Sequence, residues 1–317
     1  MIRLVSSTVL VAAAILCSVA LAAPDGQTPS MPPMAQTATP GMPPAAQSAT
    51  PGMPPAAQAE GTETAGKPGA PSGVEDKNAP AAGTVNAYHD IEFVWVPAGS
   101  YVPGLKDGGK RVVTTIGGRE EWFSDEAARP EARFARGFWM SKTEITRRQW
   151  SRVMDSRPWV ENQADDQLDV PVTWISWKDA EAFAKGLAAE GEPPCRLPTE
   201  NEWEYACRAG STTLFPFGDD PAGLDEYAWY RGTTPDGKLQ PAAARKPNAW
   251  GLCDMLGNAW EWCADTYGDD PGGEDDLRVI RGGSVNQPAT FTRPTVRLGR
   301  PAKEISARIG FRVVREP

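Results

Sequence analysis

Residue types that commonly carry out chemistry are scarce in this chain of 317 residues. His89 is the only histidine, which excludes a zinc site with three histidines and an iron site with two histidines and a carboxylate. A serine or cysteine nucleophile that depends on a histidine base would have to use this one residue. We therefore expect no histidine-dependent catalysis.

Cysteine is the second residue type with chemical potential. Beyond the N-terminal region the chain has four: Cys195, Cys207, Cys253 and Cys263. An even number in an exported protein permits two disulfides, in any of three connectivities. The spacing has no CxxC pair of the kind that binds zinc. Two interpretations stay open, structural disulfides and buried unreactive thiols.

The first 22 residues have the pattern of a secretory signal peptide. Arg3 precedes an apolar run from Val9 to Leu21, and Ala20-Leu21-Ala22 fits a small-residue cleavage site. The run is shorter than a membrane-spanning helix requires. We therefore predict a periplasmic or secreted protein. Lipid attachment at Cys17 is the alternative and the only route to a membrane that we expect, although Leu16 before it is large for such a site.

Residues 23–84 form a repetitive segment. The sequence MPPMAQTATPG at Met31 recurs as MPPAAQSATPG at Met42 and begins a third time at Met53. The segment has no aromatic residue, and all 12 tryptophans follow it. Such a chain cannot bury enough apolar surface to offset its conformational entropy, so we predict a disordered linker.

The remaining residues, 85–317, are predicted to form one α+β domain with large loops. Three helices begin with capping boxes, at Thr146–Gln149, Ser176–Asp179 and Thr199–Glu202. The strand candidates are Glu92–Val96, Phe134–Met140, Arg278–Arg281 and Gly310–Val314. The net charge of −9 argues against a nucleic-acid partner.

Seven segments of this region carry specific motifs: Phe93–Tyr101, Phe138–Thr146, Val172–Ala180, Arg196–Tyr205, Asn248–Trp262, Arg281–Ser284 and Ile309–Arg312. In this order they resemble the formylglycine-generating enzyme family, also called sulfatase-modifying factors. The resemblance implies a fold similar to C-type lectins, poor in regular secondary structure, with a groove lined by C-terminal segments. We interpret Trp203, Trp260 and Trp262 as packing residues, and Arg196, Glu202 and Glu204 as residues that cap or bridge loops.

The oxidases of this family hold copper with two cysteines that follow the Gly-Gly-Ser motif. Gln287 and Thr292 occupy those positions here. Copper(I) needs soft thiolate ligands, and an amide and a hydroxyl are hard. We therefore expect no copper, assign no catalytic residue and do not expect formylglycine-generating activity.

The resemblance also implies one calcium site, at Asp254, Gly257, Ala259 and Glu261. Two carboxylates and two backbone carbonyls suit a hard cation. Alternatively, Asp254 and Glu261 satisfy backbone N–H groups of their own loop. The family's other calcium site is not expected, because Trp229 stands where the family has asparagine.

Three functions remain. The first is a calcium-stabilised module that binds a protein, peptide or small molecule in the C-terminal groove. Amides, hydroxyls, an aromatic ring and a cation are typical of adaptable contact surfaces, and the residues concerned are Ser284, Asn286, Gln287, Phe291, Thr292 and Arg293. The second is a cysteine-less periplasmic maturation enzyme of the pyoverdine-maturation type. The third, an oxidase with relocated thiols, is disfavoured.

Overall fold

The computed structural model describes residues 79–107, 109–159, 166–188, 190–268 and 276–317. The expected signal peptide, Cys17 and most of the expected linker lie outside these residues. Residues just before the expected boundary at residue 85 contact the domain, because the backbone N–H of Gly83 donates to the Trp95 carbonyl and that of Trp95 donates to the Thr84 carbonyl. None of the helices in the described ranges is both long and apolar enough to cross a membrane.

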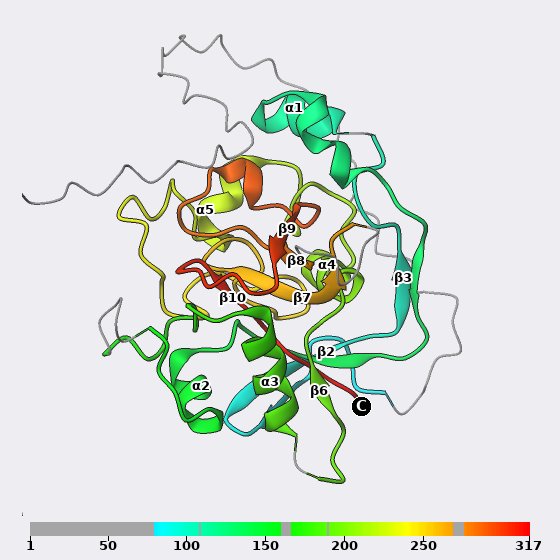
Figure 1. Ribbon diagram of the computed structural model, residues 1–317. Coiled ribbons are helices and arrows are strands. Elements are labelled where there is room, and N and C mark those ends of the chain that lie inside the picture. The colour runs from blue at the N-terminus through cyan, green and yellow to red at the C-terminus, as the bar shows by residue number, and fades with distance from the viewer. Residues whose placement is uncertain (1–78, 108, 160–165, 189, 269–275) are drawn as a thin grey trace, which may run out of the picture. The chain divides into compact units, whose positions relative to one another are not determined.

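Two sheets organise the domain (Figure 1). One has five strands in the order β1-β2-β5-β11-β6 and is antiparallel throughout. The other has four strands in the order β10-β7-β8-β9. A two-stranded ribbon pairs β3 with β4. The first sheet consists of β1 (Val85–Tyr88), β2 (Ile91–Val96), β5 (Phe138–Ser141), β11 (Val314–Arg315) and β6 (Cys195–Arg196). The second consists of β10 (Ile309–Gly310), β7 (Trp260–Thr266), β8 (Leu277–Arg281) and β9 (Arg297–Pro301). The ribbon consists of β3 (Gly99–Tyr101) and β4 (Ala132–Phe134).

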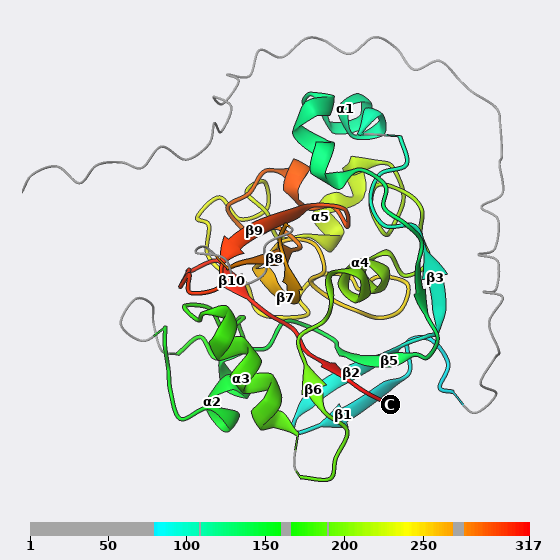
Figure 2. The ribbon, with the colours of Figure 1, turned by 45° about the vertical axis from the view of Figure 1, so that its right-hand side comes forward.

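All three predicted capping boxes are present. They begin α2 (Arg147–Val153), α3 (Trp177–Leu187) and α4 (Glu200–Arg208). In both ribbon views α2 and α3 lie beside the five-stranded sheet (Figure 2), whereas α4 packs against β7 and β8. The shorter elements are α1 (Lys110–Ile116), η1 (Glu120–Glu126), η2 (Pro221–Gly223), α5 (Leu224–Tyr227) and η3 (Ala289–Phe291).

Two predicted strands are each divided between different sheets, which corrects the sequence-based boundaries. Phe134–Met140 becomes β4 and β5, with a break at Gly137, where an added Cβ would lie 2.4 Å from the Trp95 indole. Gly310–Val314 becomes β10 and β11. The C-terminal chain thus joins the two sheets, because β10 pairs with β7 while β11 pairs with β5 and β6.

The aromatic residues of the signature segments fill the core, as predicted. Trp203 and Trp262 are fully buried and Trp260 is 4% exposed. Arg196 and Glu202 also have the bridging role that we expected. Both Arg196 terminal nitrogens lie 2.7 Å from the Glu202 carboxylate, which in turn accepts from the backbone N–H of Thr199 at the start of α4.

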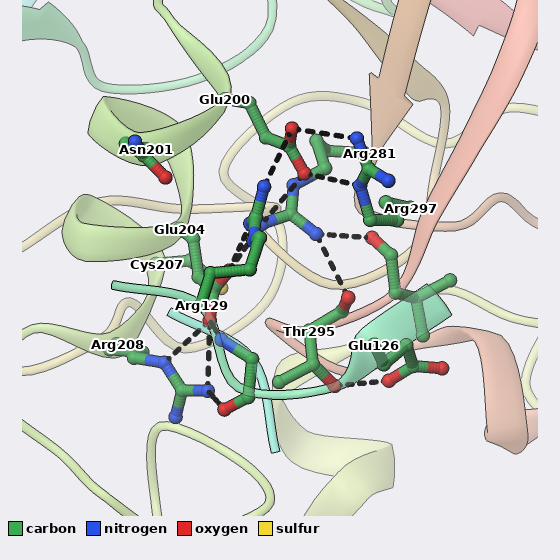
Figure 3. A network of polar contacts seen from close by, with 12 residues as sticks. Glu126, Arg129, Glu200, Asn201, Glu204, Cys207, Arg208, Arg281, Thr295 and Arg297 are labelled. Atoms are coloured by element: carbon green, nitrogen blue, oxygen red, sulfur yellow. Dashed lines mark hydrogen bonds and ion pairs between the residues drawn. The ribbon is translucent and has the colours of Figure 1, made fainter. Parts of the chain in front are cut away.

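Buried ion pairs fasten the C-terminal segments to α4 (Figure 3), and another fastens them to η1. Arg281 at the end of β8 lies 2.6 Å from Glu204 of α4, and both side chains are fully buried. Arg297 at the start of β9 lies 2.6 Å from Glu200 of the same helix. Arg293 contacts both Glu126 carboxylate oxygens, at 2.7 and 2.8 Å. The chain between β8 and β9 is therefore held at both of its ends.

The arginines keep the Glu200 carboxylate ionised. Burial by itself would raise the pKa of Glu200, but the guanidinium groups of Arg281, Arg297 and Arg129 outweigh it and lower that pKa to about 2. The pairs of Glu200 with Arg281, Arg297 and Arg129 therefore persist at physiological pH.

We predict that Arg293→Ala destabilises the domain strongly. The variant would leave the Glu126 carboxylate buried without its counter-ion, and removing one partner of a buried pair costs about 3–5 kcal/mol. Urea unfolding at neutral pH measures the loss. Arg133→Ala is the control, because its pair with Glu131 is exposed and should contribute almost nothing. Equal stability of the two variants would contradict the structural role of Arg293.

Candidate functional site

The segment between β8 and β9 contains the candidate ligand-contacting residues. It begins with Gly282 and Gly283, whose φ angles are +94° and +83°. A Cβ added at Gly283 would lie 2.5 Å from the Phe291 carbonyl oxygen, so glycine allows the two ends of the segment to approach. A turn closed by the Gln287 N–H and the Ser284 carbonyl follows, and then η3. The segment is a folded loop with a defined outer face.

Only some of the six predicted contact residues lie on that outer face. Asn286 is exposed, and Gln287 and Phe291 are half-buried. Ser284 and Thr292 are fully buried, and Arg293 is 1% exposed. This corrects the expectation that all six line a ligand surface. The three buried residues maintain the loop instead, because their side chains bond to other groups of the protein.

The two hydroxyl groups show this internal role. The Ser284 hydroxyl donates to the Asn286 side-chain oxygen at 2.7 Å, and the Thr292 hydroxyl donates to the Ala289 carbonyl at 2.7 Å. Arg231 fastens the outer part of the loop, since its backbone N–H donates to the Gln287 carbonyl and its Nε to the Asn286 carbonyl. The side chains of Asn286 and Gln287 are thereby left on a rigid backbone.

The four thiols are far from solvent and are not disulfide-bonded. Cys195, Cys207, Cys253 and Cys263 are all free and buried, which supports the interpretation as unreactive thiols. Burial raises the pKa of Cys195 and of Cys253 to about 11, and it raises the pKa of the other two as well. A protonated, buried thiol is neither a good nucleophile nor a ready copper ligand.

Glu261, which we predicted to bind calcium, forms an ion pair with Arg312. Its two carboxylate oxygens accept from Arg312 Nε and Nη2 at 2.7 and 2.8 Å, and one of them also accepts from the Trp203 indole N–H at 2.6 Å. All three side chains are fully buried. The carboxylate thus joins α4, β7 and the C-terminal chain, and its charge is balanced within the protein.

The Asp254 carboxylate has more unused hydrogen-bonding capacity than that of Glu261. One carboxylate oxygen accepts from the Ala243 N–H at 2.6 Å, a backbone donor outside the Asp254–Glu261 loop, while the other is buried and has no partner in the described part of the chain. Burial raises the pKa of Asp254 to about 6. Gly257 and Ala259 lie in the same tight loop, where a Cβ added at Gly257 would lie 2.0 Å from the Trp229 carbonyl oxygen.

Glu144 is a member of this cluster that the sequence did not reveal. It lies three residues after the end of β5, is fully buried, and neither carboxylate oxygen has a hydrogen-bond partner among the described residues. Burial raises the pKa of Glu144 well above its usual value, and the charges of Asp254 and Glu261 raise it further. Its place in the Phe138–Thr146 motif was the available signal.

The donor chemistry fits a hard cation at Asp254 and Glu144 better than at Glu261. Three buried carboxylate oxygens there lack donors, and calcium prefers such oxygens. As the side chains stand, no group of three or more histidine, cysteine, aspartate or glutamate residues in the described ranges is arranged to hold a metal ion. A cation at Asp254 and Glu144 would therefore have two carboxylates and would need its remaining oxygen ligands from backbone carbonyls or water.

Comparison with known proteins agrees with the sequence motifs. The family described as the sulfatase-modifying factor enzyme 1-like domain matches residues 80–317. "Inactive C-alpha-formylglycine-generating enzyme 2" of Mus musculus is 38% identical over 165 residues, which are 46% of this chain and 49% of the relative. The formylglycine-generating enzyme of Streptomyces coelicolor is 37% identical over 136 residues, 36% of this chain and 41% of the relative. The chain thus spans about half the length of the curated relatives it matches.

Solved structures extend the likeness over the whole domain. PvdO from Pseudomonas aeruginosa superimposes with a TM-score of 0.62 and 27% sequence identity, covering 75% of this chain and 100% of PvdO. Treponema denticola variable protein 1 has the same fold, with a TM-score of 0.59, 23% identity, and coverage of 74% of this chain and 99% of its own. On the family match, the shared motifs and the shared fold, this chain belongs to the formylglycine-generating enzyme, or sulfatase-modifying factor, family.

Proposed function

We propose that this protein is an exported, non-oxidase member of the family that binds a ligand through the loop between β8 and β9. The observation that carries the proposal is the pair Gln287 and Thr292 in place of the oxidase cysteines. Thr292 is buried and bonded within the loop, and the four described thiols lie in other elements. Export is proposed from the N-terminal 22 residues alone.

The outer face of the loop supports a binding role. Asn286 and Gln287 present amides that can both donate and accept hydrogen bonds, and Phe291 adds an aromatic ring whose centroid lies 6.3 Å from that of Trp260. The backbone beneath these side chains is fixed by Arg231, Gly283 and the ion pair of Arg293. A preorganised loop loses little entropy when it binds.

A maturation enzyme of the pyoverdine-maturation type is the second candidate. The likeness to PvdO over the full length of that protein favours it. The hydroxyls of Ser284 and Thr292, however, are both engaged in hydrogen bonds inside the loop. Gln287 and Phe291 can contact a ligand without displacing any of these hydrogen bonds, so a binding function is better supported.

Selection of displayed peptides against the full chain tests the binding surface. We expect the selected peptides to bind Asn286→Ala and Gln287→Ala about tenfold more weakly, since truncating a central contact typically costs more than 1 kcal/mol. Lys238→Ala, an exposed charge outside the loop, is the control and should bind normally. The proposal fails if all three variants bind the peptides equally, or if no peptide is selected.

A second measurement concerns the oxidase reaction. Incubation of the copper-treated chain with oxygen and a peptide carrying the sulfatase recognition motif should give no aldehyde product by mass spectrometry, because soft ligands are missing from the loop. The double variant Gln287→Cys, Thr292→Cys is the matched control and should compete for copper(I) where the natural chain does not. Aldehyde formation by the natural chain would contradict the proposal.

We further propose that calcium binds at Asp254 and Glu144 and stabilises the fold. The three unpartnered carboxylate oxygens support this site, with Gly257 and Ala259 in the adjoining loop. With calcium at 100 times its Kd, binding contributes about 2.7 kcal/mol, so chelation should lower the melting temperature by roughly 5–10 °C.

Asp254→Asn should abolish this response, because the amide removes one of the two charges that attract the cation. Asp236→Asn is the control, since Asp236 is exposed and distant in sequence from the cluster. Scanning calorimetry with and without chelator measures both variants. An undiminished calcium response in Asp254→Asn would show that the ion binds elsewhere.

A further inference from the structure

A cavity of about 270 Å³ lies between the chain that follows β3 and the C-terminal end of α4. None of the residues that line it belongs to the loop between β8 and β9. Tyr101 and Tyr205 contribute aromatic walls, with ring centroids 5.5 Å apart. Lys106, Arg111 and Arg208 also line the cavity. Asp107 lines the cavity as well, so cations outnumber carboxylates three to one on its walls.

The hydrogen-bond acceptors of this cavity are already occupied. Both carboxylate oxygens of Asp107 accept backbone N–H groups, from Gly109 and Arg111. The hydroxyls of Ser211 and Thr213 bond to each other, and that of Thr213 lies 2.6 Å from the Phe215 carbonyl. A ligand that mainly donates hydrogen bonds would therefore find few free acceptors on these walls.

The carbonyl groups at the end of α4 are also bonded. Those of Ala206 and Cys207 accept from the Asn248 amide, and those of Tyr205 and Arg208 accept from the N–H groups of Ala209 and Ser211. The negative end of this helix is thus partly neutralised, and the adjacent Arg208 guanidinium opposes it further. The helix end does not prevent an anion from entering the cavity.

Several donors, in contrast, remain available. Tyr205 is 6% exposed, lines the cavity, and its hydroxyl has no hydrogen-bond partner in the described ranges. Lys106 is exposed and makes no ion pair within those ranges either. Arg111 reaches Asp107 at 3.6 Å, and Asp219 and the Thr212 carbonyl at 3.5 Å. These distances are longer than the 2.7–2.9 Å typical of a charged hydrogen bond.

We propose that this cavity binds a small oxyanion, the carboxylate or phosphate group of a metabolite-sized ligand. The Tyr205 hydroxyl donates to the anion from the floor, while Lys106 and Arg111 supply positive charge at the rim. Arg208 stays in place as a wall, because its guanidinium is held by Glu204 and by the Gly104 carbonyl at 3.0 and 3.1 Å. The aromatic rings of Tyr101 and Tyr205 contact the body of the ligand.

The protonation and the fixed ring position of Tyr205 are consistent with this donor role. Burial raises the pKa of its hydroxyl to about 12, so the group remains protonated at neutral pH. Its ring is fixed by stacking on Phe134, with centroids 4.7 Å apart, and by an edge contact with Trp250 at 5.0 Å. The hydroxyl is therefore presented in one position.

Thermal titration of the full chain with three probes tests the proposal: inorganic phosphate, acetate and glucose, each at constant ionic strength. We expect the melting temperature to rise with phosphate, acetate or both, beyond the effect of sodium chloride. A response to phosphate alone assigns a phosphate ligand, and one to acetate alone a carboxylate. No response to either, or an equal response to glucose, would overturn the proposal.

Variants locate the effect. Tyr205→Phe removes only the hydroxyl and should weaken the apparent Kd by at least about tenfold, the usual contribution of a hydrogen bond to a charged group. Lys106→Ala should weaken it severalfold, as expected for a lost charge at the rim. Lys303→Ala, an exposed lysine outside the cavity, changes the net charge equally and should have no effect. If Lys303→Ala weakens binding as much as Lys106→Ala, the anion is held by general charge and not by this cavity.

Discussion

The contact between Arg281 and Glu204 is the constraint on which the rest of the domain depends. Both groups are removed from water entirely, and such a removal is costly unless every donor and acceptor finds a partner. Arg281 meets most of this demand by donating also to the carbonyls of Thr295 and Val296, while its Nε has no hydrogen-bond partner among the described residues. One guanidinium therefore fixes the distance between α4 and both ends of the β8–β9 connection. Arg312 and Glu261 repeat the arrangement between β7 and the C-terminal chain.

This charge framework explains how the fold can exist without the oxidase cysteines. The positions of Gln287 and Thr292 are determined by Arg231, by the Gly282-Gly283 turn and by the Arg293 pair, none of which involves a thiol. The backbone that carries the outer residues of the loop is consequently fixed without any thiol. A family built in this way can change the chemistry of the loop without disturbing the core beneath it, so family membership does not by itself determine activity.

The elements predicted best from sequence were those with local signals. The capping boxes at Thr146, Ser176 and Thr199 lie within four residues of chain, and all three form. Strand β7 was missed because its first four residues are all buried, which leaves no polar alternation to read. The burial of Arg293 and the cluster around Glu144 could not be inferred, since their partners are remote: Glu126 lies 167 residues from Arg293 along the chain. Sequence motifs identified the loop, but long-range ion pairs decided which of its side chains face outward.

The four buried thiols allow the local opening of this domain to be measured. Each belongs to a different part of the fold: β6, α4, the loop before β7, and β7 itself. An alkylating reagent reacts with an accessible thiolate, and burial both covers these sulfur atoms and keeps them protonated. Modification must therefore wait for a local opening of the surrounding structure. The rate at which each cysteine is labelled becomes a measure of how often its own element opens, so the natural chain carries four built-in probes of local unfolding.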